Sequence, residues 1–323
     1  MKKLLLLLFF STSLNLSAQS DSAAKQKNQF PSDRYFRFNY DNDFFSATDR
    51  YYTQGIYIDL VMPVIRHSPF SKVLIRLNKK ADNYYGITLR QDGFTPRSIR
   101  YDSLVIGERP YASLFFVTHT LASVNQEKML KLCTSLDLGV MGPDAKGEEE
   151  QKAIHKALDN IQPLGWENQI ANDYVINYNA RIEKGLIQKT YFDFSLSGEG
   201  RLGSMYTDLA AGGLLRVGFL QPYFANLGLT KQKDQRKFQC YVFAKGNIKA
   251  VGYNATLQGG VFNRNSIHTL PAKDITRVVA TGYLGFVVAY KRLSLEYTKA
   301  YISPEFRNGL FHGWGHCVIA VCF

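Results

Sequence analysis

Apolar and polar residues alternate along most of this chain, and this alternation limits its possible folds more than any other feature. A period of two places one set of side chains on each face of a β-strand. Segments of this kind recur between turns rich in Gly, Asn, Asp and Lys, and they number about twelve. The clearest is residues 191–202, where Phe192, Phe194 and Leu196 alternate with Asp193, Ser195, Ser197 and Glu199. The pattern predicts an all-β fold.

The two ends of the chain indicate where this fold resides. Residues 1–18 combine a basic start, a short apolar run and a small residue at Ala18, which is the pattern of a secretory signal peptide. The apolar run is much shorter than the roughly 20 residues of a membrane-spanning helix. The last segment, residues 315–323, is strand-like and ends on Phe323, which resembles the end of bacterial outer-membrane barrels.

We therefore expect a signal peptide at residues 1–18, a polar leader at 19–32 and one antiparallel transmembrane β-barrel of about twelve strands at 33–323. Such a barrel crosses the bacterial outer membrane many times, and its closure leaves no strand edge exposed to lipid. The mean hydropathy of -0.19 agrees with this expectation, because alternating strands average polar and apolar residues.

The charge of the chain suggests its partners. The formal net charge is +12, and two positive charges leave with the signal peptide. A basic exported protein favours an anionic partner, and lipopolysaccharide or outer-membrane lipid is expected, whereas nucleic acid is not. We expect a monomer. The four cysteines lack metal-site spacing, so they read as small apolar residues, with a disulfide left open.

One passage, residues 141–169, is helical in pattern. It has an acidic start, which complements a helix dipole, and Pro and Gly residues that end the helix. We therefore expect a short helical loop insertion over residues 143–160. Gln151 and His155 lie one turn apart on the same face of this helix. From the helix alone, His155 is equally compatible with a packing role and a functional role.

Carboxylates and amides also cluster in the first predicted hairpin. Asp41 and Asp43 are assigned to one polar strand face, Asn42 lies between them, and Thr53 lies on the polar face of the next strand. Asn and Asp are common in turns, which explains the cluster without a function. Oxygen ligands packed in this way also suit a hard cation such as Ca²⁺.

Five motifs, taken in order, resemble the outer-membrane lipid A 3'-O-deacylases. They are Asn42-Asp43-Phe44 with residues 49–55, then residues 109–112, residues 142–147, the pair Gln151 and His155, and residues 165–169. One departure is Ser113, which follows residues 109–112 where Gly is expected. The resemblance implies a twelve-stranded barrel with its active site facing the outer leaflet. It implies a hydrolase that removes the 3'-linked acyl or acyloxyacyl chain from lipid A with a divalent cation, Ca²⁺.

The resemblance also implies residue roles. His155 would be the general base that activates water, and Asn42 and Asp43 would lie beside it as catalytic residues and metal ligands. Thr53 and Gln151 would be polar neighbours of the substrate and the oxyanion.

The family's lysine has no secure equivalent, and Arg97 is the nearest basic candidate. Trp166 is expected in an interfacial aromatic belt.

Two other functions remain open at this point: a non-catalytic barrel of the porin or transporter kind, and a phospholipase A-type barrel. The chain lacks a Gly-x-Ser-x-Gly nucleophile elbow, so water is the simpler nucleophile. The catalytic hypothesis requires that His155 approach Asn42 and Asp43.

Overall fold

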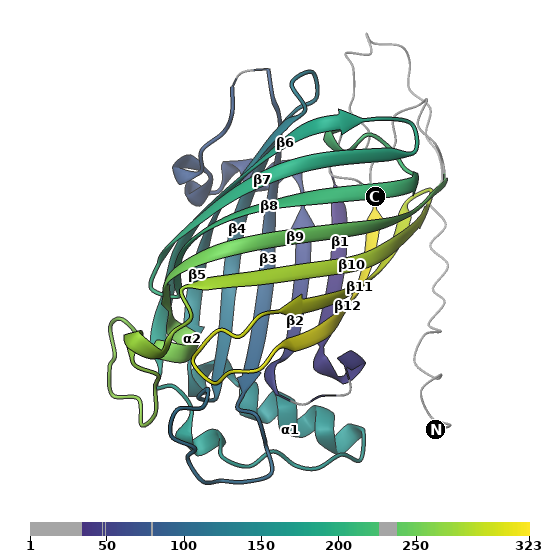
Figure 1. Ribbon diagram of the computed structural model, residues 1–323. Coiled ribbons are helices and arrows are strands. Elements are labelled where there is room, and N and C mark those ends of the chain that lie inside the picture. Colours follow the sequence, from purple (N-terminus) through teal and green to yellow (C-terminus); the bar gives the residue numbers. More distant parts are fainter. Residues whose placement is uncertain (1–33, 47, 49, 79, 226–237) are drawn as a thin grey trace, which may run out of the picture. The chain divides into compact units, whose positions relative to one another are not determined.

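A computed structural model describes residues 34–323 except 47, 49, 79 and 226–237, so the expected signal peptide and nearly all of the polar leader lie outside the described residues. In this part of the chain, twelve antiparallel strands form a closed barrel (Figure 1), which confirms the predicted fold class and strand number. Every strand pairs with its neighbours in sequence, and β1 closes the barrel against β12. The strands are β1 (Tyr35–Asn42), β2 (Tyr51–Val61), β3 (Asp82–Thr95), β4 (Ala112–Asn125), β5 (Leu130–Met141), β6 (Asp173–Gln188), β7 (Phe192–Gly203), β8 (Tyr206–Phe219), β9 (Phe238–Asn254), β10 (Val278–Tyr290), β11 (Leu293–Ile302) and β12 (His312–Cys322).

The alternation in sequence becomes an alternation in burial. In β2, Ile58 and Leu60 are exposed on the outer face, while Asp59 and Val61 are buried on the lumen face. Apolar outward residues suit lipid, and many of the charged inward residues form ion pairs within a strand or between strands. These pairs include Arg37–Asp59, Arg90–Asp92, Lys131–Glu183, Arg201–Asp208 and Arg216–Asp193.

The helical elements gather mainly at one end of the barrel, opposite the C-terminus (Figure 1). The predicted insertion at 143–160 is a 3-10 turn, η4, followed by helix α1, which ends at Ala157. No helix in the described ranges combines the length and apolar character that a membrane crossing needs. The helical elements are η1 (Asp43–Ser46), η2 (Pro63–His67), η3 (Pro69–Val73), η4 (Pro143–Ala145), α1 (Gly147–Ala157), η5 (Trp166–Asn168), η6 (Tyr223–Ala225), α2 (Ala255–Gln258) and η7 (Ala272–Asp274).

The cysteines do not cross-link the barrel. All four lie in the described part of the chain, and all four are free.

The outward and inward faces of β9 predict opposite responses to a carboxylate. Ile248 is 62% exposed on the outer face, whereas its neighbour Asn247 points inward between Lys245 and Lys249. We expect Ile248→Glu to destabilise the barrel in lipid vesicles by roughly 1–2 kcal/mol, because it buries a charge in hydrocarbon. Asn247→Glu, the matched control, should cost less. Urea unfolding in vesicles measures both, and equal losses would contradict the assigned faces.

Candidate active site on the outer wall

The strand register lines up six residues from six adjacent strands, β11, β12 and β1 to β4. Residues paired directly across an antiparallel ladder project to the same side of the sheet. Gln54 lies four residues before the outward-facing Ile58, so all six face away from the lumen. We call these six residues the outer row. They are, in order around the wall, Lys299, Gly315, Asn42, Gln54, Gly93 and Ser113.

Asp41, one residue before Asn42, faces the lumen. Its carboxylate contacts the His316 ring at 2.5 Å and accepts a hydrogen bond of 2.8 Å from the Tyr52 hydroxyl. The expectation that Asp41 and Asp43 share a strand face is wrong, because β1 ends at Asn42 and Asp43 begins the 3-10 turn η1. Asp41 is therefore separated from the outer row by the barrel wall.

Asp43 organises the loop between β1 and β2. Its side chain is 2% exposed. Its carboxylate accepts hydrogen bonds from the Arg50 backbone N–H at 2.7 Å, the Thr48 hydroxyl at 3.2 Å and the Thr53 hydroxyl at 3.3 Å. The structure thus brings together two predicted site residues, Asp43 and Thr53. It also gives them the turn chemistry that the sequence suggested.

Asn42 joins this loop to the outer face of the wall. Its Oδ1 accepts a hydrogen bond of 2.7 Å from the Phe44 backbone N–H, and its Nδ2 donates to the Tyr40 hydroxyl at 3.0 Å. The loop and the wall are therefore linked through one amide side chain.

Turn η1 lies against the outer face of the wall. Lys299 donates to the Phe45 carbonyl at 2.5 Å and to the Ser46 hydroxyl at 2.7 Å. Gly315 leaves room for this turn, because a Cβ there would lie 2.7 Å from the Phe45 Cβ. Sequence reasoning missed Lys299. The sequence did contain a signal for it, because Lys299 is the one lysine among the outward-facing residues of β11, which are otherwise apolar or aromatic.

Helix α1 is attached to the same wall at the other end of the outer row. The Ser113 hydroxyl donates to the Gly142 carbonyl at 2.9 Å and accepts from the Gly147 backbone N–H at 3.3 Å. Gln91 on β3 donates to the Ala145 carbonyl at 2.9 Å. A side chain at Gly147 would collide with Ser113, since its Cβ would lie 2.3 Å from the Ser113 Cβ. Ser113, the departure from the family pattern, is thus the point where the helix begins on the wall.

Glu150, on the first turns of α1, reaches the wall at Gln54. Burial raises the pKa of the Glu150 carboxyl to about 7, and the nearby Gln54 amide offsets part of this rise. The two side chains are close, yet neither Glu150 oxygen nor the Gln54 Nε2 makes a hydrogen bond of good geometry. Leaving a buried polar group unpaired costs about 1–3 kcal/mol, so such groups mark a place that a ligand or water can occupy. Sequence reasoning used Glu150 only as a complement to the helix dipole.

Gln151 and His155 fix the chain that follows the helix. Gln151 accepts a hydrogen bond of 2.8 Å from the Trp166 indole. His155 Nδ1 lies 2.5 Å from the Ile161 carbonyl oxygen. A carbonyl only accepts, so Nδ1 carries the proton and Nε2 is the basic nitrogen. This tautomer is the one that a general base requires.

The contacts at the start of α1 run from β4 toward β2. The helix contacts β4 at Gly147 and reaches β2 through Glu150, and β1 with Asn42 is the next strand. His155 follows Glu150 by five residues, a rise of about 7.5 Å along the axis. The direct approach of His155 to Asn42 and Asp43 stays a prediction.

The comparisons with known proteins agree with this architecture. A family model described as "Outer membrane protein LpxR" matches residues 4–323. The chain belongs to the LpxR family. The solved structure of LpxR from Salmonella typhimurium matches with a TM-score of 0.74 at 19% identity, covering 90% of this chain and 100% of that one. The KdgM porin matches with a TM-score of only 0.40 at 5% identity, covering 90% of this chain and 99% of that one. The search of curated proteins gave no match.

Family membership confirms the resemblance found in the sequence, and with the closed barrel it establishes a multi-pass protein of the outer membrane. Arg97 occupies a different place in this LpxR-family chain. It lines a cavity of about 360 Å³ together with Glu108 and His268, and no outer-row residue lines that cavity. Its role as the equivalent of the family's lysine stays a prediction.

Trp166 is not in an interfacial belt. It is fully buried and packs against Tyr111, with 4.8 Å between the ring centroids and the two rings tilted by 43°. The expectation for this residue is wrong because the segment after α1 folds back over the loops instead of reaching the lipid boundary.

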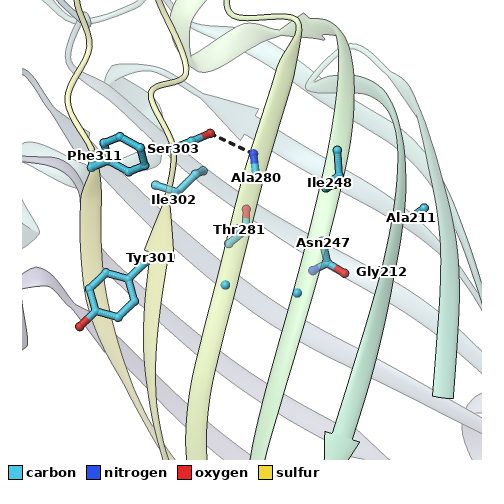
Figure 2. A pocket seen from close by; sticks show the side chains of 12 residues that line it. Ala211, Gly212, Asn247, Ile248, Ala280, Thr281, Tyr301, Ile302, Ser303 and Phe311 are labelled. Atoms are coloured by element: carbon cyan, nitrogen blue, oxygen red, sulfur yellow. Dashed lines mark hydrogen bonds between the residues drawn. The ribbon is translucent and has the colours of Figure 1, made fainter. Parts of the chain in front are cut away.

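A second hollow lies on the outer wall across β8 to β11, and Figure 2 shows the side chains around it. Its volume is about 520 Å³, and Tyr301 and Phe311 flank one side. Gly246 and Gly282 form its floor, where an added Cβ would meet nothing within 4 Å. The lining contains no carboxylate, imidazole, amine or thiol. It is therefore a feature of the lipid-facing surface and not a reaction centre.

The two predicted calcium ligands, Asn42 and Asp43, lie next to each other at the end of β1. Asn42 and Asp43 offer oxygen atoms, which a hard cation prefers, and these oxygens already accept hydrogen bonds from the Phe44 and Arg50 N–H groups and the Thr48 hydroxyl. The described residues contain no group of three or more acidic, His or Cys side chains placed for a metal. The two residues fit calcium in chemistry, and water, main-chain carbonyls or substrate would have to complete its coordination.

The raised pKa of Glu150 predicts a pH-dependent docking of α1. The folded pKa of about 7 exceeds the ordinary value of 4.5, so docking is strongest below pH 4.5 and weakens as the pH rises through 7. The full effect is at most about 3 kcal/mol. We expect Glu150→Gln to increase hydrogen-exchange protection of α1 amides at pH 8.5 and to leave it unchanged at pH 4.5. Glu149→Gln is the control, because Glu149 forms an exposed pair with Lys146. Equal protection of wild type and Glu150→Gln at pH 8.5 would refute the assigned burial.

Proposed function

We propose that this protein is an outer-membrane hydrolase that removes the 3'-linked acyl or acyloxyacyl chain from lipid A, using water activated by His155. One observation carries the proposal: the polar outer row and the helix that bears His155 lie on the outside of the barrel wall. A membrane lipid can reach that surface without entering the lumen. Membership of the LpxR family and the motifs shared with lipid A deacylases support the same substrate class.

The position of the site along the barrel also supports an outer-leaflet substrate. The ends of β1 and β12 meet at Tyr35 and Cys322, at the end of the barrel opposite α1. Outer-membrane barrels carry their longer loops on the extracellular side. The loop of residues 142–172, which contains α1, therefore belongs to the extracellular end, where lipopolysaccharide forms the outer leaflet.

The chain's own residues supply the base for ester hydrolysis. His155 Nε2 takes a proton from water, and the hydroxide attacks the ester carbonyl carbon. The Ile161 carbonyl holds the imidazole in the required tautomer and stabilises the imidazolium that forms. When the tetrahedral intermediate collapses, the bond to the sugar oxygen breaks and the fatty acid is released.

Asn42, Asp43 and Thr53 would organise the oxyanion side of the site. Asp43 holds the loop through Arg50, and Asn42 links that loop to the wall. Calcium bound at Asn42 and Asp43 would polarise the ester carbonyl. Gln151 would be a polar neighbour of the substrate, and its carbonyl oxygen also accepts a hydrogen bond from the Trp166 indole.

Replacing the proposed base tests the reaction. We expect His155→Ala to lower the release of the 3' chain about 10²–10⁴-fold, because no other base replaces the imidazole. Mass spectrometry of lipid A from cells that express each variant measures the release. His67→Ala, an exposed histidine in η2 at the other end of the barrel, is the control.

The outcomes of this experiment separate the candidate functions. Heat-modifiable migration on a gel verifies that each variant forms a barrel. Full release by His155→Ala would exclude the imidazole as the base. Lipid A unchanged by the wild type, with phospholipid hydrolysed instead, would indicate a phospholipase A-type barrel. No change in either lipid would indicate a non-catalytic barrel.

Calcium removal is a second test. We expect a chelator to abolish acyl release by the purified protein and added Ca²⁺ to restore it, since Asn42 and Asp43 offer only oxygen ligands. The measurement is acyl release from lipopolysaccharide in detergent micelles. Activity that persists in excess chelator would remove the cation from the reaction.

A further inference from the structure

The unpaired polar atoms between α1 and the wall point to a group that the reaction still lacks. Glu150 offers two buried carboxyl oxygens without hydrogen-bond partners, and Gln54 offers a buried Nε2 donor. Gln54 is 2% exposed and fixed from below, because it lies over Gly93, where a Cβ would come within 3.0 Å of its Cγ. The Gln54 amide lies against the Glu150 carboxyl group without a hydrogen bond of good geometry, so a ligand oxygen between the two side chains could bind both.

The chemistry of the two side chains selects the kind of ligand. An amide N–H donates, whereas a carboxyl group accepts when ionised and donates when protonated. A phosphate would be repelled by the ionised carboxyl group, and a bare cation would leave the Gln54 donor unused. An alcohol or alkoxide oxygen satisfies both side chains. In an ester hydrolysis that oxygen is the leaving group.

We propose that Glu150 and Gln54 bind the sugar oxygen of the scissile ester, with Glu150 as the general acid that protonates the leaving alkoxide. This inference rests on the proposed deacylase function. When the bond between the acyl carbon and the sugar oxygen breaks, its electron pair goes to the sugar oxygen, and the Glu150 proton is transferred to it. The Gln54 N–H stabilises the developing charge. His155 keeps the proton taken from water and loses it to solvent, as Glu150 regains one.

The position of the pair suits this division of labour. Gln54 is paired in register with Asn42, and Glu150 precedes His155 by five residues on α1. The base and the acid thus come from one helix, and an ester carbonyl near Asn42 would have its sugar oxygen near Gln54. The Ile161 carbonyl holds the imidazole, whereas the carboxyl group lies against Gln54, so each group can hold its own proton.

The groups that face Glu150 keep its proton available. Tyr40 of β1 and Gln54 of β2 approach it from the wall, and Asp92 of β3 acts on it through the wall. On its own helix, Lys146 and Glu149 pair with each other at the exposed surface, and His155 lies one to two turns further along. With burial as the largest influence, the carboxyl pKa lies near 7, so a large fraction is protonated at neutral pH.

The test uses two esters of the same acyl chain, with the full-length protein in detergent micelles. Lipid A has an alkoxide leaving group that needs a proton, whereas a p-nitrophenyl ester has a leaving group that does not. We expect Glu150→Gln to lower kcat for lipid A by about 10²-fold and for the aryl ester less than about threefold. The fall in activity of the wild type on lipid A above pH 7 should also disappear in the variant.

A second variant and a control keep the result interpretable. Gln54→Leu should lower kcat for lipid A more than for the aryl ester, and it should move the fall in activity to higher pH, because the Gln54 amide lowers the Glu150 pKa. Glu149→Gln should affect neither ester, because its carboxylate is exposed. Equal losses on both esters in Glu150→Gln would make Glu150 a structural residue and overturn the proposal. If the only effect of Glu150→Gln were a higher calcium requirement, Glu150 would be a cation ligand, and the proposal would also be overturned.

Failure of this inference and failure of the proposed function give different results. If the wild type leaves lipid A intact, the deacylase function is wrong. A different set of results would refute the general-acid assignment alone. In that case the wild type releases the 3' chain and His155→Ala is inactive on both esters, but Glu150→Gln lowers kcat equally for both esters.

Discussion

The pairing of β1 with β12 is the constraint on which the rest of the structure depends. It closes the barrel and fixes the register between the first and last strands, so Asn42 lies opposite Gly315. Through that register Lys299 from β11 reaches the loop that follows β1. The contact between the Asp41 carboxylate and His316 supports the same register from the lumen side. A shift of one residue would exchange the two faces, and Asn42 would then point into the lumen.

The two faces of β1 explain how one short segment serves two environments. Asp41 belongs to a lumen network with Tyr52 and His316, and Asn42 belongs to the outer row. The polar residues of the lumen stabilise the barrel by pairing with one another. On the outer side, Asn42, Lys299 and Ser113 have hydrogen-bond partners, whereas Gln54 and the neighbouring Glu150 retain buried atoms without one. The proposed site therefore lies where the outer face carries polar groups that a ligand could bind.

The sequence alone predicted the barrel, its twelve strands and the helical insertion, because these depend on local periodicity. It also located His155 on that insertion. It could not pair Gln54 with Glu150, since that contact depends on the register of β2 and on the attachment of α1 at Ser113. For the same reason, the sequence analysis interpreted Ser113 as a departure from a motif and Trp166 as a residue of the membrane-interface belt. Their roles follow from how the loop folds back on the wall.

The proposed base and the outer row belong to two separately stabilised parts of the fold. The hydrogen bonds of the closed strands hold the outer row. His155 depends on the loop core instead, where Gln151 holds Trp166 and the Ile161 carbonyl holds the imidazole. Ser113 and Gln91 join the two parts at the start of α1. Since the far end of the helix is held mainly by the loop, the distance between base and ester depends on the loop core. Changes there, well away from the lipid, would alter the reaction without changing the barrel.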